Sequence, residues 1–65
     1  MSLLDHAEAR ARARGGRVLS RRPDSLHVEL PDAHRARGLY FELLQGWPRE
    51  FDGITVGRRL RVFAD

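Results

Sequence analysis

The chain contains no cysteine, and this absence limits how 65 residues can form a stable fold. In a protein of this size, the free energy gained by burying apolar side chains barely exceeds the conformational entropy lost on folding. Disulfides, a structural metal or oligomerisation usually supply the difference. Without cysteine, neither disulfides nor thiolate metal sites can form. We therefore expect a single domain, residues 1–65, that gains stability as a homodimer; well-idealised packing of a monomer is the alternative.

Residues 2–14 have the features of a short helix. Ser2 is followed three residues later by Asp5, which resembles a capping box. Alanine, the strongest helix former, recurs through the segment, and Gly15 supplies a stop signal. The apolar stripe is narrow and consists of Leu3, Leu4, Ala7 and Ala11. Such a helix buries little surface, so we expect it to pack against a partner.

A longer helix is predicted between Asp32, a suitable N-cap, and Gly46. At 100° per residue, one side collects most of the apolar side chains. These are Ala33, Ala36, Tyr40, Leu43, Leu44 and Trp47, with Leu39 and Phe41 on the two flanks. So wide an apolar face exceeds what one thin sheet can cover. We expect its flanks to meet the first helix or another subunit.

Residues 17–22 and 25–30 are predicted to form a β-hairpin across a turn at Pro23. The second strand alternates apolar and polar side chains, which is typical of a half-buried strand. Proline presets the backbone φ that the first central position (i+1) of a type I turn requires. The strand is therefore expected to place Leu26, Val28 and Leu30 in the core.

The last segment, residues 54–63, has two interpretations. It is either one strand with Arg58 at the rim of the sheet, or a hairpin whose loop is 57–59. The hairpin would set Val56 opposite Leu60 and Ile54 opposite Val62, with all four side chains facing inward. In both interpretations the fold class is α+β. We expect a small, mainly antiparallel sheet of three to four strands, with the longer helix across it and an N-terminal helix (α-β-β-α-β).

All 12 basic residues are arginine, and they are unevenly distributed within a net charge of +3. Residues 9–22 carry six arginines and no acid, residues 23–57 have a net charge of −3, and residues 58–65 one of +2. This asymmetry fits a polyanionic partner, complementary surfaces in an oligomer, or a solvated face. The exclusive use of arginine is compatible with a thermophilic source and equally with GC-rich coding.

Arginine and an aromatic side chain alternate in the last segment. Arg59, Arg61 and Phe63 share the face opposite the predicted core, and Arg17 and Arg21 are expected to do the same on the first strand. An open sheet face with these side chains is the arrangement that stacks single-stranded bases. Arginine on an edge strand also prevents aggregation. Nucleic-acid binding is therefore our second hypothesis.

Our first hypothesis is a non-enzymatic, self-associating module of unassigned cellular role. The candidate self-association residues are Leu3, Leu4, Leu39, Phe41 and Phe63. The three histidines lack the spacing of zinc sites, and no motif indicates a catalytic residue, a cofactor or a small-molecule substrate. An enzyme with a site at a subunit seam, using Glu50, Asp52 or a histidine, is the least favoured alternative. No apolar run reaches the ~20 residues of a membrane helix, and no signal layout is present, so we expect a cytoplasmic protein.

Overall fold

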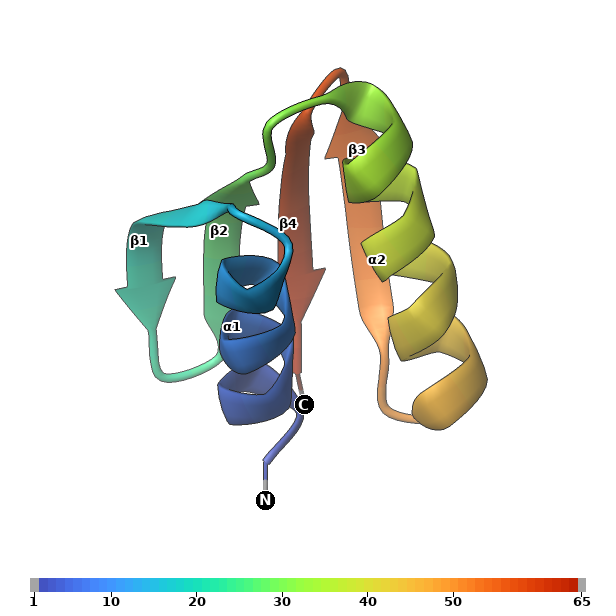
Figure 1. The fold of residues 1–65 in the computed structure, drawn as a ribbon. Coiled ribbons are helices and arrows are strands. Elements are labelled where there is room, and N and C mark those ends of the chain that lie inside the picture. The colour runs from blue at the N-terminus through green and yellow to red at the C-terminus, as the bar shows by residue number, and fades with distance from the viewer. Residues whose placement is uncertain (1, 65) are drawn as a thin grey trace.

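A computed structural model describes residues 2–64 and contains two helices and four strands. In chain order the elements are α1 (Leu3–Ala13), β1 (Arg17–Arg22), β2 (Ser25–Glu29), α2 (Ala33–Gly46), β3 (Asp52–Val56) and β4 (Arg59–Phe63). The strands form one antiparallel sheet in the order β1-β2-β4-β3. Both helices lie on one face of this sheet (Figure 1). The predicted α+β class is confirmed.

The order of the strands makes β1 and β3 the two edges of the sheet. Since β2 and β3 each pair antiparallel with β4, they run parallel to one another with β4 between them. The chain reaches β3 from β2 through α2, which lies over the β3 side of the sheet (Figure 1). Neither helix in residues 2–64 combines the length and apolar character needed to cross a bilayer.

The starts of both helices and the end of α1 follow the local signals in the sequence. The Ser2 hydroxyl accepts a hydrogen bond from the backbone N–H of Asp5 at 3.1 Å. The Asp32 carboxylate does the same for the N–H of Arg35 at 2.7 Å. Each cap satisfies a donor that the first helical turn leaves free. Gly15 ends α1 with a φ of +80°, a value that L side chains rarely adopt.

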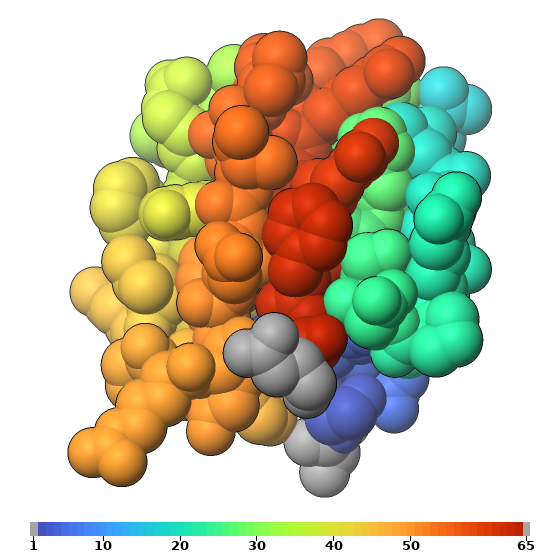
Figure 2. Space-filling model, turned by 180° about the vertical axis from the view of Figure 1, so that it is seen from behind, coloured from blue at the N-terminus to red at the C-terminus, as the bar shows by residue number. Residues whose placement is uncertain are grey.

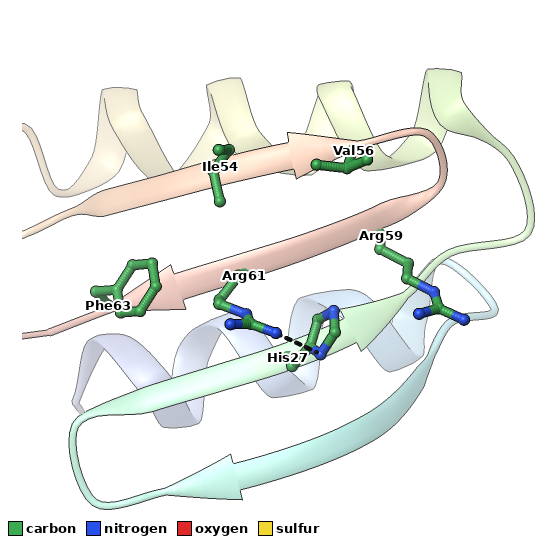
Figure 3. A pocket seen from close by; sticks show the side chains of 6 residues that line it. All are labelled: His27, Ile54, Val56, Arg59, Arg61 and Phe63. Atoms are coloured by element: carbon green, nitrogen blue, oxygen red, sulfur yellow. Dashed lines mark hydrogen bonds between the residues drawn. The ribbon is translucent and has the colours of Figure 1, made fainter.

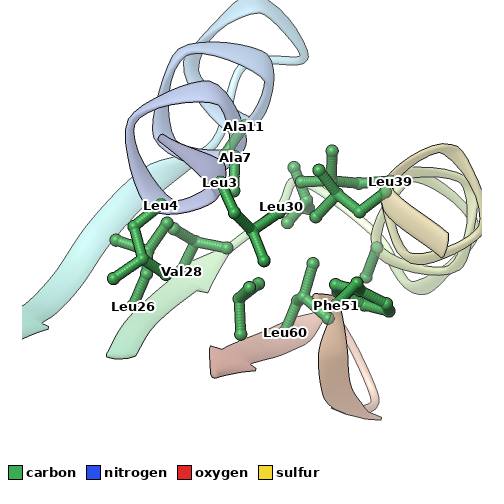
Figure 4. Close-up of a cluster of buried hydrophobic side chains, with 13 residues drawn as sticks. Leu3, Leu4, Ala7, Ala11, Leu26, Val28, Leu30, Leu39, Phe51 and Leu60 are labelled. Carbon is green, nitrogen blue, oxygen red and sulfur yellow. The ribbon is translucent and has the colours of Figure 1, made fainter. Parts of the chain in front are cut away.

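The core lies between the helices and the sheet (Figure 4). Alternate residues of β2 and β4 point inward, as period-2 patterning requires. The helices and loops supply the remaining buried side chains. The full set is Leu3, Leu4, Ala7, Ala11, Leu26, Val28, Leu30, Ala36, Leu39, Leu43, Phe51, Leu60 and Val62. The predicted burial of the α1 stripe and of the 25–30 strand is therefore confirmed.

The last segment is a hairpin, but its register differs from the prediction. Val56 pairs with Arg59, so the loop contains only Gly57 and Arg58. Gly57 has a φ of +59°, which suits the first loop position of a type II′ turn. The expected opposition of Val56 to Leu60 and of Ile54 to Val62 is wrong. Because a shift of one residue exchanges the faces of a strand, Ile54 and Val56 point away from the core, 55% and 70% exposed.

Close packing around Gly53 explains this register. A Cβ at Gly53 would lie 2.6 Å from Cζ of Phe51 and 3.0 Å from the backbone oxygen of Arg61. Phe51 is buried, and its ring covers the inner side of β3 at this position. Only glycine fits under that ring. Gly53 therefore faces inward, and by alternation Ile54 must face outward.

The apolar face of α2 is only partly covered by its own chain. On one flank, Glu42 accepts hydrogen bonds from Arg10 of α1 and from Arg14 at the C-cap of α1. Leu44 lies about 200° around the helix from Glu42, since each residue turns the helix by ~100°. It therefore faces away from α1, on the β3 side of the molecule. Leu44 and its i−3 neighbour Phe41 are both exposed, contrary to the expected placement of Leu44 in the central stripe.

Candidate functional site

The sheet surface opposite the helices is here called the open face, and no helix of residues 2–64 crosses it (Figure 2). Its side chains come from alternate positions of the four strands and form three rows across the sheet. The rows are Arg17, Glu29, Arg59 and Val56; Ser20, His27, Arg61 and Ile54; and Arg22, Ser25, Phe63 and Asp52. Arginines dominate on β1 and β4, and apolar side chains on β3.

Glu29 binds three of the arginines around the first row. Its carboxylate accepts hydrogen bonds from Nε of Arg17 at 3.1 Å and from Nε of Arg59 at 3.2 Å. Nε of Arg58 lies 3.7 Å from Oε2 of the same carboxylate. Desolvation raises the pKa of the Glu29 carboxyl, but the hydrogen bonds from Arg17 and Arg59 and the charge of Arg58 outweigh it, so the net pKa lies below its ordinary value. Glu29 thus stays ionised and neutralises part of this cationic row.

Arg21 does not belong to the open face, although the sequence placed it there with Arg17. It donates to Asp5 and Glu8 of α1, each at 2.9 Å. A β-bulge between Val18 and Ser20 inserts one residue into β1, and this shifts the alternation of the strand. Two positions that are both odd in number therefore end on opposite faces.

Arg61 and Phe63 lie on the open face as predicted, beside His27 of β2 (Figure 3). Nη2 of Arg61 is 3.4 Å from Nδ1 of His27. Burial lowers the pKa of His27, and the charges of Arg61 and Arg59 lower it further, against an opposing effect of Glu29. The imidazole is therefore neutral at pH 7 and can accept from Arg61. The Phe63 ring is 38% exposed.

Two adjoining hollows mark the open face. The larger has a volume of about 400 Å³ and is lined by His27, Ile54, Val56, Arg59, Arg61 and Phe63 (Figure 3). The smaller has about 180 Å³ and is lined by Ser20, Arg22, Ser25, His27, Arg61 and Phe63. Three residues belong to both: His27, Arg61 and Phe63. The larger hollow has an apolar wall on β3, whereas the smaller is polar and cationic.

The two edge strands of the sheet, β1 and β3, differ in how well they are protected against pairing with a further strand. β1 carries the bulge and three arginines, two devices by which natural proteins prevent unwanted strand pairing. β3 is regular against β4, and after Asp52 it contains only Gly53, Ile54, Thr55 and Val56. It has neither charge nor proline within these four positions. Its β-branched residues are also among those that favour strands.

The predicted self-association residues are divided by the structure. Leu3, Leu4 and Leu39 are buried in the core of the chain itself, where no partner can reach them. Phe41 and Phe63 are exposed. Sequence reasoning missed Ile54 and Val56, because it placed both inward. The Gly57-Arg58 pair, a two-residue loop with glycine first, was the signal that could have given the correct register.

Most of the basic block at 9–22 is bound within the chain. Arg10 of α1 and Arg14 at its C-cap contact Glu42 of α2 at 2.9 Å and 2.6 Å, and Arg12 contacts Glu8 within α1 at 3.3 Å. Burial raises the pKa of Glu42, but the hydrogen bond from Arg10 and the charge of Arg14 outweigh it, and the net pKa lies below its ordinary value. Arg10 and Arg14 thus link α1 and its C-cap to α2, whereas Arg12 is paired within α1.

We expect this ion-pair network to make the fold sensitive to acid. Glu29 and Glu42 have folded pKa values below the ordinary 4.5. A carboxyl group whose pKa is lower in the folded state than in the unfolded state stabilises the fold at pH values above its unfolded-state pKa. This contribution is lost as the pH falls from 4.5 through the folded-state pKa. Circular dichroism melts from pH 7 to pH 3 should show Tm falling below pH 4.5, with a smaller fall in Glu42→Gln. The control is Glu50→Gln, which removes an exposed carboxylate and should leave the acid-induced fall in Tm as large as in the wild type. An equal fall in Tm in the wild type and in Glu42→Gln would contradict this prediction.

The residues described here contain no cluster of three or more His, Cys, Asp or Glu side chains that could hold a metal ion. Glu50 and Asp52 are both exposed and lie outside the two hollows of the open face. The geometry thus defines a small α+β protein with an arginine-bearing open sheet face and one unprotected edge. Comparison with known protein families, with curated proteins and with solved structures finds no match in any of the three. We therefore infer its function from these two surfaces.

Proposed function

We propose that this chain is a non-enzymatic cytoplasmic module that acts as a homodimer, joined by pairing of β3 with β3 of a second copy. The observation that carries the proposal is the unprotected edge of β3. An edge strand that is regular and, from Gly53 to Val56, uncharged is a template for further strand pairing. The other edge, β1, has the bulge and arginines that oppose such pairing. A cysteine-free chain of this size also gains most from a partner.

The backbone groups of β3 support this pairing. In a two-residue hairpin, the residues that flank the loop exchange hydrogen bonds, and here they are Val56 and Arg59. By alternation, the backbone groups of Gly53 and Thr55 point away from β4 toward solvent. Two β3 strands related by a twofold axis at Thr55 can exchange both hydrogen bonds between their Thr55 residues.

The side chains fit the same register. With the axis at Thr55, Ile54 of each copy lies opposite Val56 of the other copy on the open face. The twofold axis therefore gives two such cross-strand pairs, and pairs of this kind are stabilising. Asp52 lies opposite Arg58 of the second copy. Arg58 is 59% exposed at its side chain, and its 3.7 Å contact is the longest of the three arginine contacts to Glu29, so it is the one most easily redirected.

The helix layer adds a second apolar contact at the same edge. Leu44 and Phe41 are exposed on α2, and Leu44 faces the β3 side. A twofold axis at Thr55 brings α2 toward α2 of the second copy. The apolar residues on both layers of this edge, namely Ile54, Val56, Leu44 and Phe41, would then be covered together. This makes the edge an interface of two layers, as in an extended α+β sheet.

Sedimentation velocity at micromolar concentration tests the proposal. We expect the wild type to sediment as a dimer and Ile54→Lys as a monomer with an unchanged circular dichroism spectrum. The added charges face an apolar partner, and a cost of several kcal/mol corresponds to at least ~100-fold weaker association. Thr55→Pro should have the same effect, since proline at an outward-facing edge position disturbs no pair with β4.

The matched control is Ser20→Lys, which puts the same charge on the open face at the protected edge, β1. It should remain dimeric. A wild type that stays monomeric at high micromolar concentration would refute the proposal. So would an equal loss of dimer in Ser20→Lys and Ile54→Lys, because that result would mean a general charge effect and no β3 interface.

A further inference from the structure

We propose that the open face binds single-stranded nucleic acid, with a base stacked on Phe63 and the flanking phosphates at Arg61 and Arg22. Phe63, Arg61 and Arg22 all belong to one copy of the chain, so their contacts with the ligand do not require the homodimer. Ile54 and Val56, on the wall of the larger hollow, also belong to the proposed β3 interface. The site is built from the two hollows, which share His27, Arg61 and Phe63. Its side chains come from all four strands, and the sheet holds them on one face.

The charge on this face supports an anionic ligand. Within residues 2–64, Arg22 and Arg61 have no carboxylate within 4.0 Å. By contrast, the arginines of the helices and of the Glu29 cluster are mostly paired. These two guanidinium groups, which no described carboxylate neutralises, belong to one surface, and both line the smaller hollow. Guanidinium groups of this kind bind phosphate oxygens in bidentate geometry.

The apolar part of the site supports a planar group. Phe63 is 38% exposed and lies between the apolar wall of β3 and the polar hollow. Ser20 and Ser25, on the other side of Phe63, have short side chains that leave the approach over the sheet open. Stacking on an aromatic side chain and contact with arginine together are how sheet surfaces bind bases and phosphates.

The openness of the face favours a polymer with exposed bases. Small-molecule sites usually enclose most of their ligand, whereas these hollows are shallow and lie on an open sheet (Figures 2 and 3). In a duplex, the faces of the bases are stacked on each other and cannot reach Phe63. A peptide of acidic residues alone, such as polyglutamate, would meet the arginines but offers no aromatic plane to the ring. Single-stranded DNA or RNA offers both groups at once.

Fluorescence anisotropy with a labelled 12-nucleotide oligo(dT) tests the proposal with the full chain. Two phosphate contacts predict a slope of log K against log salt near −1.4, at about −0.7 per contact for single strands. Affinity should then fall about sevenfold between 50 and 200 mM salt. Phe63→Ala should weaken binding roughly tenfold or more, and Phe63→Trp should preserve it, because the stacking surface remains.

Arg61→Gln should weaken binding and reduce the magnitude of the salt slope by about 0.7, the contribution of one phosphate contact. The matched control is Arg37→Gln on α2, which removes one exposed arginine from the opposite layer and should leave the slope unchanged. Equal effects of the two substitutions would overturn the site, because only net charge would then matter. Absence of binding at 50 mM salt would also overturn it.

Two competitors distinguish the ligand class. A hairpin duplex of the same length and polyglutamate should each displace the labelled oligo(dT) much less effectively than unlabelled oligo(dT). Equal competition by polyglutamate would identify a general polyanion surface and refute the stacking role of Phe63. Equal competition by the duplex would do the same. Circular dichroism should show that Phe63→Ala keeps the fold, since the ring is not part of the core.

Discussion

Replacing Leu39 with alanine should lower the free energy of unfolding by about 3 kcal/mol, within a range of 2–5 kcal/mol. Leu39 is fully buried on α2, at the point where the helix faces β4 and the loop residues of the core (Figure 4). A truncation here loses the transfer free energy of the side chain and leaves a cavity. A domain of this length has about 3–10 kcal/mol in total, so the variant should be close to unfolding.

Urea denaturation, followed by circular dichroism at one protein concentration, measures this effect. The control is Leu39→Met, which keeps the volume nearly constant and should cost less than ~1.5 kcal/mol. If Leu39→Ala lowers the free energy of unfolding no more than Leu39→Met does, Leu39 is not tightly packed in the core. The concentration must be held constant because dimerisation adds to the apparent stability.

Gly53→Ala should destabilise the fold by about 1–3 kcal/mol, although alanine restricts the unfolded chain. The new Cβ would lie 2.6 Å from Cζ of Phe51 and 3.0 Å from the backbone oxygen of Arg61, so the ring or the strand has to move. Gly38→Ala is the matched control. A Cβ at Gly38 meets nothing within 4 Å, and alanine within a helix should stabilise by about 0.5–1 kcal/mol.

A double-mutant cycle identifies the cause of the Gly53 effect. Phe51→Leu removes the ring atoms that the new Cβ would meet, so the cost of Gly53→Ala should be smaller in that background. Additive costs would show that the ring does not determine the register of β3. Thermal melts measure the change in Tm for Gly53→Ala and for Gly38→Ala. If both substitutions shifted Tm in the same direction, the result would contradict the packing around Gly53.

The two proposed surfaces have a geometric relation that extends their function. In a homodimer with its axis at Thr55 and perpendicular to the sheet, the open faces of both copies point in the same direction. Two Phe63 sites would then lie on one continuous surface. An oligonucleotide long enough to reach both would gain avidity through effective concentration. The Thr55→Pro variant would keep the single site and lose this gain.

Local signals predicted most of the fold, including the start of each helix. The caps at Ser2 and Asp32 are hydrogen bonds within three residues, so they depend little on the rest of the chain. The burial of Leu26 and Val28 followed from period-2 alternation in a strand that has neighbours on both sides. Patterning of this kind is reliable where one face of a strand meets a core.

The candidate site was predicted only in part. Arg59, Arg61 and Phe63 were assigned to the correct face, because β4 alternates regularly about Leu60 and Val62. Arg21 was misplaced by a bulge, which inserts one residue and leaves no clear mark in the sequence. Ile54 and Val56 were assigned to the core since apolar residues in a strand are usually buried, and this concealed the apolar wall of the larger hollow.

The sequence by itself determined the helices, their caps, the first hairpin and the inward residues of the central strands, because these depend on hydrogen bonds and periodicity within a few residues. Only the tertiary structure decided two features. The outward orientation of Ile54 and Val56 depends on Phe51 covering Gly53. The assignment of arginines to carboxylates depends on side chains about 30 positions apart, such as Arg14 with Glu42 and Arg59 with Glu29. Pairings between distant segments arise from packing, which no local pattern encodes.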